Sequence, residues 1–422
     1  MIKFVKNFSL YALTNIVNAA IPFLLLPFLT ARLSKEGYGI LTNVDVFTRF
    51  TLPFVLLGIN GAINTAFFRE KKEHFSSYLS SALLISFISA LLLLPVCWGI
   101  SPWLSGSFQI PPRWALAVPL ICLGQTFVQI VLGLYMIKKE PLRYGAMQVS
   151  LTLMNFLLSI FLVYRYNWEG RLYGIFITYL FFLAMAVFVL LRNHYLTRFI
   201  KKTYIKDALL FGIPLIPHMI SGPVIQFSDR FFITHYAGLA EAGLYNVGYQ
   251  IGVALGLITF AFNQSYVPYL YENLSSLTER KKQTLVLQSY LIMGGFLLGA
   301  FALQLVAPLL FKWFIHPRFH EALRYVNIVA IGSAFGGMYY VVANYIFYEK
   351  KTKMLALITF CNALLSITLN SLLTRKYGAL GAAWTYTITS FFVFISVWIL
   401  SMKVFPMPWF RFPKKMFSPS KE

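Results

Sequence analysis

Charged residues are scarce in this chain of 422 residues, since Asp, Glu, Lys and Arg together make up 12% of it. A soluble domain carries about 25% charged residues, and so few charges cannot coat the surface of two or three soluble domains. Because 58% of the residues are hydrophobic and 18% aromatic, disorder, collagen and coiled coil are excluded as well. The composition indicates a protein whose solvent is a lipid bilayer.

Cysteines and acidic residues are also few, at three and 14. Cys97, Cys122 and Cys361 lie in apolar runs without CxxC or CxH spacing, so we predict neither a metal site nor a disulfide framework. The P-loop, GxSxG, HExxH and dinucleotide motifs are missing, and we expect no cofactor. The net charge of +22 comes from basic residues between apolar runs, as in membrane proteins, so no nucleic-acid partner is expected.

Twelve apolar runs are long enough to cross a bilayer, which takes about 20 residues. The sequence therefore predicts an all-α integral membrane protein of about twelve transmembrane helices, whose first run is retained and not cleaved as a signal peptide. The runs lie near residues 8–31, 39–68, 76–100, 114–137, 144–164, 172–191, 207–234, 242–270, 284–311, 325–347, 354–374 and 379–402.

The turns between these runs alternate between rich and poor in Lys and Arg. The side with the two termini holds 24 of the 36 basic residues and the other side holds 10, including Arg171. The bias predicts that both termini are cytoplasmic. The longest outer loops, 101–113 and 312–324, are too short for a catalytic domain. Residues 403–422 form a basic aromatic tail with four prolines, for which binding to the inner leaflet and disorder both stay open.

An internal repeat relates the two halves. The segment LTARLSKEGYGILTN matches FITHYAGLAEAGLYN when Gly39 is set on Gly243. We interpret the match as two pseudo-symmetric six-helix lobes, 1–200 and 201–402, around a central cavity, with coincidence in apolar sequence as the alternative. Transporters built from such parallel repeats bind substrate between their halves and alternate access.

Four polar residues of the second run share one side of its helix. At 100° per residue, Arg49, Asn60 and Asn64 fall within about 100° of Asp45. A charge at the bilayer centre costs at least about 2.5–3.5 kcal/mol, so such residues face a cavity or a partner. We expect Arg49, Asn60 and Asn64 to bind substrate and Asp45 to couple an ion. The alternative is an Asp45–Arg49 ion pair that holds helices together.

Polar residues also occur in the first run of each half, beside prolines that interrupt the helix. Broken helices of this kind fit a moving gate, with a static kink as the alternative. We expect Asp229 and His218 to take part in ion coupling. The substrate-binding residues expected in these two runs are Asn15, Asn18, Gln226 and Arg230.

Two segments carry a family resemblance. The segment NFSLYALTNIVNAAIPFLLLPFLTARLSKEGYGIL resembles the opening of Wzx-type polysaccharide-unit flippases, within the multidrug/oligosaccharidyl-lipid/polysaccharide exporter superfamily. SDRFFITHYAGLAEAGLYNVGYQI resembles that family's seventh span and loop, with an Asp-Arg pair followed by Gly-Leu-Tyr. The resemblance extends over the whole chain in length, span count and two-half layout. Its motifs specify the superfamily better than the substrate.

The resemblance implies a two-lobed transporter, not an enzyme, in the bacterial cytoplasmic (inner) membrane. It would move undecaprenyl-pyrophosphate-linked oligosaccharide to the outer leaflet for O-antigen and lipopolysaccharide biosynthesis. Its partners would be membrane lipid and the polysaccharide polymerase and chain-length machinery. Arg49 and Arg230 would bind the pyrophosphate, because guanidinium groups bind phosphate bidentately.

Two other function classes stay open. The first is an ion-coupled multidrug or cation exporter of the same superfamily, which would need an acidic cavity without compensating cations. The second is a membrane-embedded polysaccharide assembly enzyme, which the short outer loops disfavour. The two arginines and two aspartates within the spans leave no excess charge, so counting charges does not by itself predict an anionic substrate.

Overall fold

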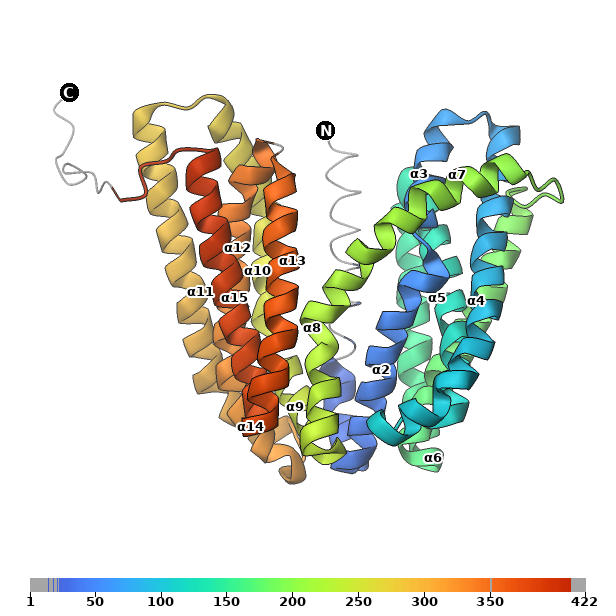
Figure 1. Ribbon diagram of the computed structural model, residues 1–422, viewed down its shortest axis with the longest axis horizontal. Helices are drawn as coiled ribbons and strands as arrows, with labels where there is room; N and C mark the ends of the chain where they lie inside the picture. The colour runs from blue at the N-terminus through green and yellow to red at the C-terminus, as the bar shows by residue number, and fades with distance from the viewer. Residues whose placement is uncertain (1–13, 15–17, 19–20, 22, 350, 411–422) are drawn as a thin grey trace. The chain divides into compact units, whose positions relative to one another are not determined.

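The computed structural model describes residues 14, 18, 21, 23–349 and 351–410, and only the backbone of residues 72, 73, 218 and 352. In this part of the chain the regular structure is entirely helical (Figure 1), which confirms the all-α prediction. The helices belong to two compact units, residues up to Leu244 and residues from Tyr245 onward. We refer to them as unit 1 and unit 2.

In unit 1 a helical segment, Phe23–Arg32, precedes α2. The N-terminus of α2 is capped, since the Ser34 hydroxyl accepts a hydrogen bond from the Gly37 N–H at 3.0 Å. Pro112 and Pro141 stand at helix starts, where a missing N–H costs nothing. The helices are α2 (Lys35–Leu56), α3 (Ile59–Arg69), α4 (Lys72–Phe108), α5 (Pro112–Ile137), α6 (Pro141–Arg192), α7 (Lys202–Gly212) and α8 (Ile216–Ala237), with a 3₁₀ turn at Ile213–Leu215; α9 (Leu239–Gly252) begins in this unit.

Helix α6 has 52 residues, which is long enough for two membrane passes. A straight helix of that length would extend about 78 Å, against about 30 Å of hydrocarbon. At Asn167 the backbone turns to φ 52° and ψ −135°, and the two arms then pack so closely that Gly170 has no room for a Cβ beside the Leu162 carbonyl. The arms correspond to the predicted runs 144–164 and 172–191.

Unit 2 contains a helical hairpin similar to the one that the two arms of α6 form. Gly378 turns the chain at φ 59° and ψ −144°, and Gly381 has no room for a Cβ beside the Leu373 carbonyl. The elements of this unit are α10 (Ala254–Ser275), α11 (Glu279–Phe314), a 3₁₀ segment (Pro317–Ala322), α12 (Leu323–Tyr348), α13 (Thr352–Leu369), a π-helical segment (Asn370–Thr374), α14 (Arg375–Tyr377) and α15 (Ala379–Val404).

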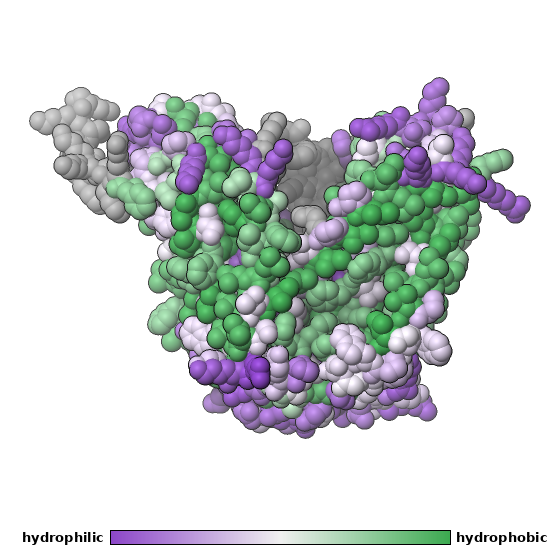
Figure 2. Space-filling model, in the orientation of Figure 1, coloured by the Kyte–Doolittle hydropathy of each residue, from purple (hydrophilic) through white to green (hydrophobic). Residues whose placement is uncertain are grey.

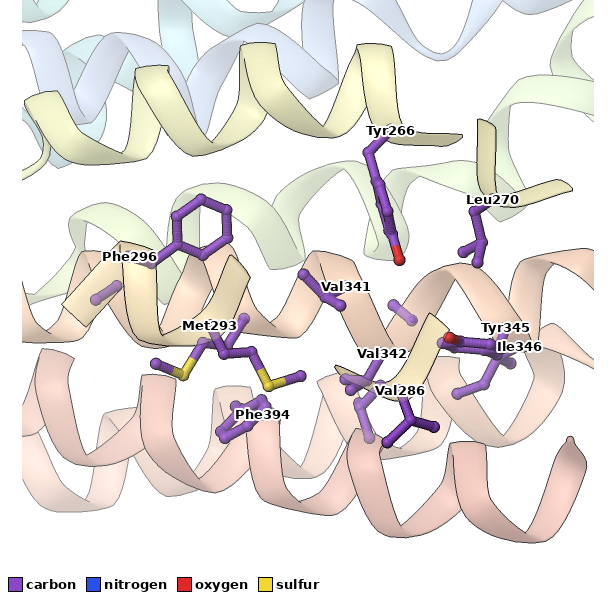
Figure 3. Packing of buried hydrophobic residues seen from close by; sticks show 14 of the residues in the cluster. Tyr266, Leu270, Val286, Met293, Phe296, Val341, Val342, Tyr345, Ile346 and Phe394 are labelled. Atoms are coloured by element: carbon purple, nitrogen blue, oxygen red, sulfur yellow. The ribbon is translucent and has the colours of Figure 1, made fainter. Parts of the chain in front are cut away.

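The core of unit 2 forms where α10, α11, α12 and α15 meet. Met293 and Phe296 of α11 lie beside Val341 of α12 and Phe394 of α15 (Figure 3). Tyr266 of α10 joins this cluster with a side chain that is 6% exposed. The helices of this unit are therefore fixed to one another by large apolar and aromatic side chains.

The chain after α15 folds back onto unit 2. Trp409 is 2% exposed, and its ring packs on the rings of Tyr290, Tyr345 and Trp398. The Tyr290 hydroxyl donates to the Trp409 carbonyl at 2.6 Å. The predicted tail therefore starts with an anchored segment, while its residues 411–422 lie outside the described part of the chain.

Nine helical segments in the described residues are long and apolar enough to cross a membrane. The pair Lys202–Leu215 and Met219–Ala237, bent by 41°, adds a tenth if it is one span. The two arms of α6 count once in that total. Half of the residues of the predicted first run, 8–31, lie outside the described residues, so the count of twelve stays a prediction.

Each unit has the surface of a membrane protein. Hydrophobic residues cover the middle of the visible face and hydrophilic residues gather at its two ends (Figure 2). In unit 1, α7 and the α3–α4 turn lie at one end and the α4–α5 turn at the other (Figure 1). Helices α7 and α8 pack within unit 1, whose boundary is Leu244. The predicted lobes 1–200 and 201–402 divide the chain by its repeat and stay a prediction.

Candidate functional site

The Asp45–Arg49 ion pair of α2 is open to its surroundings. Arg49 Nε lies 2.8 Å from Asp45 Oδ2, and the two side chains are 47% and 56% exposed. Asn43 and Val44 before the pair, and Val46 and Thr48 within it, are buried. An exposed ion pair in the middle of a membrane span needs an aqueous environment, because lipid would make it costly.

The second ion pair, Asp229–Arg230 of α8, is enclosed. Arg230 Nη1 lies 2.5 Å from Asp229 Oδ1 with side chains 1% and 7% exposed, and it also donates to the Gln226 carbonyl at 2.7 Å. Phe227 links the two pairs, since its ring centroid is 4.4 Å from Arg49 Cζ and 5.3 Å from Arg230 Cζ. Arg49 is thus exposed and Arg230 enclosed, and a contact of either arginine with substrate stays a prediction.

Three predicted amide ligands are exposed in unit 1: Asn60 and Asn64 on α3 and Gln226 on α8. The single helical arc drawn through Asp45, Arg49, Asn60 and Asn64 is wrong, because α2 ends at Leu56 and left-handed residues separate it from α3. The break occurs where the chain crosses α7, since Gly212 has no room for a Cβ beside the Leu57 carbonyl.

Arg171 lies in a different place from the one predicted. The sequence assigned it to an outer turn, but it belongs to the second arm of α6 and reaches back to the first arm. Its Nη1 donates to Asn155 Oδ1 and to Ser159 Oγ, both at 2.5 Å. It also interacts electrostatically with Asp45. With Arg171 included, the charged cluster of unit 1 has three arginines and two aspartates.

Gln125 and Tyr179 complete this cluster. The Tyr179 hydroxyl is hydrogen bonded to Gln125 and interacts electrostatically with Asp45, Arg49 and Arg171. Neither Tyr179 nor Arg171 was predicted from the sequence. A signal did exist for Arg171: Asn155 and Ser159 are polar residues four apart in an apolar arm, and such a pair needs a partner.

The remaining predicted residues lie near the start of the chain or on α8. Asn18 Oδ1 accepts a hydrogen bond from the Thr152 hydroxyl of α6, so this amide joins two segments. Asn15 and the side chain of His218 lie outside the described residues. Their predicted roles in substrate binding and ion coupling stay predictions.

Helices α2 and α8 are held together beside the charged cluster. Asn43 is fully buried, and its Nδ2 donates to Thr234 Oγ1 and to the Phe108 carbonyl, each at 2.8 Å. Thr234 Oγ1 lies 3.1 Å from Asn43 Oδ1. This bond fixes the register in which Arg49 of α2 meets Phe227 of α8.

The model of one protein family, described as "Polysaccharide biosynthesis protein", matches residues 4–274. That match covers more than half of the chain. The chain belongs to this family. A putative O-antigen transporter of Shigella flexneri is 23% identical over 414 residues, which cover 89% of this chain and 93% of the transporter.

Two solved structures share the fold of the present chain. An inward-facing multidrug resistance MATE family transporter of the MOP superfamily matches with a TM-score of 0.73 at 12% identity, over 92% of this chain and 98% of its own. The lipid II flippase MurJ, in an inward closed conformation, matches with a TM-score of 0.72 at 15% identity, over 93% and 87%. The fold is therefore one that both kinds of protein use.

Proposed function

We propose that the protein is a flippase that moves lipid-linked oligosaccharide units across a membrane by alternating access. The observation that carries the proposal is the open Asp45–Arg49 pair within a membrane span, backed by Arg171. The family and the similarity to a putative O-antigen transporter support it. No step of such a transport cycle forms or breaks a covalent bond, so the protein is a transporter and not an enzyme.

The chemistry of the substrate fits the charges of unit 1. A sugar-pyrophosphate head cannot cross about 30 Å of hydrocarbon unaided. The cluster carries one more positive charge than negative charges, and Arg171 partly compensates Asp45. Arg49 can therefore bind a phosphate oxygen. Asn60, Asn64 and Gln226 supply neutral donors and acceptors for hydroxyl groups.

The drug or cation exporter is less well supported, although the fold also serves multidrug transporters. A cation needs a carboxylate that is not already neutralised. Asp45 is paired with Arg49 and Asp229 with Arg230. The charged cluster of unit 1 therefore favours an anionic ligand.

The proposal extends to the finer architecture. We infer twelve spans in two six-helix lobes around a central cavity, cytoplasmic termini in the bacterial inner membrane, and an undecaprenyl carrier. The repeated hairpins at Asn167 and Gly378 and the bias of basic residues, 24 to 9 once Arg171 is left out of the outer turns, support this architecture. The polymerase and chain-length machinery of O-antigen synthesis would take the product.

Ion coupling is part of the proposal. Protonation of Asp45 or Asp229 would raise the positive charge of the cluster and thereby favour the anionic substrate. The test measures transport by the Asp45→Asn and Asp229→Asn variants in vesicles, with and without an imposed proton gradient. Variants that still respond to the gradient as the wild type does would contradict a role of these carboxyl groups.

The decisive experiment is gene deletion followed by analysis of the lipid-linked pool. We expect lipid-linked oligosaccharide to accumulate on the inner leaflet, and complementation by wild type to clear it. Arg49→Ala should fail to clear the pool. Arg113→Ala is the matched control, because it removes an arginine ion pair with Glu169 at the end of the spans. A normal pool together with new drug sensitivity would favour an exporter.

A further inference from the structure

The membrane spans of unit 2 differ from those of unit 1 in having no charged residue in their interior. Asp45, Arg49, Arg171, Asp229 and Arg230 all belong to unit 1. A binding surface within the spans of unit 2 would therefore select an uncharged group. The stretches without Asp, Glu, Lys or Arg are 242–271, 283–311, 325–348, 354–374 and 379–402.

One helix of unit 2 nevertheless carries an exposed polar face. Gln264, Ser265 and Tyr269 of α10 are exposed, Tyr269 by 43%. Within the described residues the side chains of Gln264 and Ser265 form no hydrogen bond, and the span that contains them, Leu239–Ser275, is the least apolar of the nine. Exposed amide and hydroxyl groups fit poorly against lipid chains, so this face contacts water or a polar ligand.

Pro268 and Gln288 add further polar groups to the same face. Pro268 lies inside α10 and has no N–H, so the Gln264 carbonyl loses its helical donor and stays available as an acceptor. The Tyr269 hydroxyl donates to Gln288 Oε1 of α11 at 3.1 Å. This bond orients the Gln288 amide and leaves its NH₂ group as a donor.

We propose that this face, formed by Gln264, Ser265, Pro268, Tyr269 and Gln288, binds the carbohydrate part of the transported unit. The inference rests on the proposed function. A sugar offers hydroxyl groups to the amides and an apolar C–H face to the Tyr269 ring.

A phospholipid headgroup is the alternative ligand for this face. A phosphate needs a cation, but the nearest charged residue along α10 is Glu272, one turn from Tyr269, and its carboxylate would repel phosphate. The face thus complements a neutral polyol.

The test measures binding of two probes to the purified full-length protein. One probe is the lipid-linked oligosaccharide extracted from the host after deletion of this gene, and the other is undecaprenyl pyrophosphate. Wild type should bind the first more tightly than the second. Tyr269→Ala and Gln264→Leu should each weaken binding of the first probe at least threefold and leave the second unchanged. Arg49→Ala should weaken both equally.

Two controls separate a lost contact from a damaged fold. Tyr269→Phe keeps the ring and should retain most of the affinity. Phe301→Ala on α11 removes another exposed ring, 58% exposed in the structure, and should change neither affinity.

Equal wild-type affinity for the two probes, or an equal loss for both in Tyr269→Ala, would overturn the carbohydrate face and leave the flippase proposal intact. The flippase proposal fails separately if Arg49→Ala binds undecaprenyl pyrophosphate as the wild type does.

Discussion

Asp45–Arg49 and Asp229–Arg230 have the same chemistry and opposite surroundings, and this difference sets what each substitution costs. Removing one partner of a buried pair leaves an uncompensated charge and costs about 3–5 kcal/mol, whereas an exposed pair contributes about 0–1 kcal/mol. We therefore expect Asp229→Asn to lower the unfolding temperature by several degrees and Asp45→Asn to leave it nearly unchanged. Thermal unfolding in detergent measures both. Equal shifts would contradict the enclosed position of Arg230.

Asn167 adopts a backbone conformation that favours glycine, with φ 52° and ψ −135°. A residue with a Cβ in such a region costs about 1–3 kcal/mol. Asn167→Gly should therefore raise the unfolding temperature. The matched change is Gly378→Asn, which places a side chain at the equivalent turn of unit 2 and should lower it. A destabilised Asn167→Gly protein would show that the Asn167 side chain outweighs the backbone strain.

Some candidate site residues could be found in the sequence because a charge in an apolar run is conspicuous, and their roles stay predictions. Asp45 and Arg49 were identified that way, and their exposure agrees with an aqueous face. Arg171 was missed because it stands near the end of a run, where basic residues are usual. Its long side chain reaches Asn155 and Ser159 through a tertiary contact, which sequence spacing does not show.

At the scale of elements, glycines mark the places where helices touch. Gly212 of α7 meets the Leu57 carbonyl with no room for a Cβ, whereas a Cβ on Gly222 of α8 would meet nothing within 4 Å. Gly212→Ala should thus destabilise the protein by about 1–3 kcal/mol through overpacking. Gly222→Ala should be neutral or slightly stabilising, because Ala favours the helix. Expression level and unfolding temperature check both. Similar behaviour of the two variants would contradict the contact of α7 with the break between α2 and α3.

The repeat motif has a structural counterpart in unit 1. Gly39 has no room for a Cβ beside the Leu239 carbonyl, and Gly243 has none beside the Lys35 carbonyl. Positions 35 and 39 align with 239 and 243 in the repeat. The two glycines are therefore equivalent, and so are the two carbonyl groups that they contact. Such reciprocity is typical of two related helices that cross. It supports the interpretation as a repeat over coincidence.

The repeated hairpins were harder to find from the sequence. Both follow a Tyr and place a Gly three residues after the turn, as Tyr166, Asn167 and Gly170 and as Tyr377, Gly378 and Gly381 do. The turn residues themselves, Asn167 and Gly378, differ chemically, and their similar conformation is seen only in the structure. Apolar periodicity located the arms but carried no information on how closely they pack.

At the scale of the whole molecule, the amino-acid composition was enough to predict a membrane protein and an all-helical fold. The units could not be predicted in the same way. Helices α7 and α8 lie in the second predicted lobe, 201–402, yet they pack within unit 1. Serine hydroxyls hold the preceding linker, since Ser76 Oγ donates to the His194 carbonyl at 3.0 Å and Ser80 Oγ accepts from the Thr197 N–H at 2.9 Å. Such tertiary bonds leave no periodic pattern in the sequence.

The orientation of the molecule depends on the two passes of α6, and cysteine labelling tests both. In a protein whose three cysteines are replaced by alanine, single cysteines at Lys138, Lys281, Arg113 and His316 mark four turns. Lys138 precedes α6 and Lys281 follows α10. If α6 crosses twice, α7–α8 once and α9–α10 once, both positions lie on the cytoplasmic side. An impermeant maleimide added to spheroplasts should then label Arg113→Cys and His316→Cys, but not Lys138→Cys or Lys281→Cys. Labelling of Lys281→Cys without Lys138→Cys would mean an odd number of passes between them and would contradict the hairpin at Asn167.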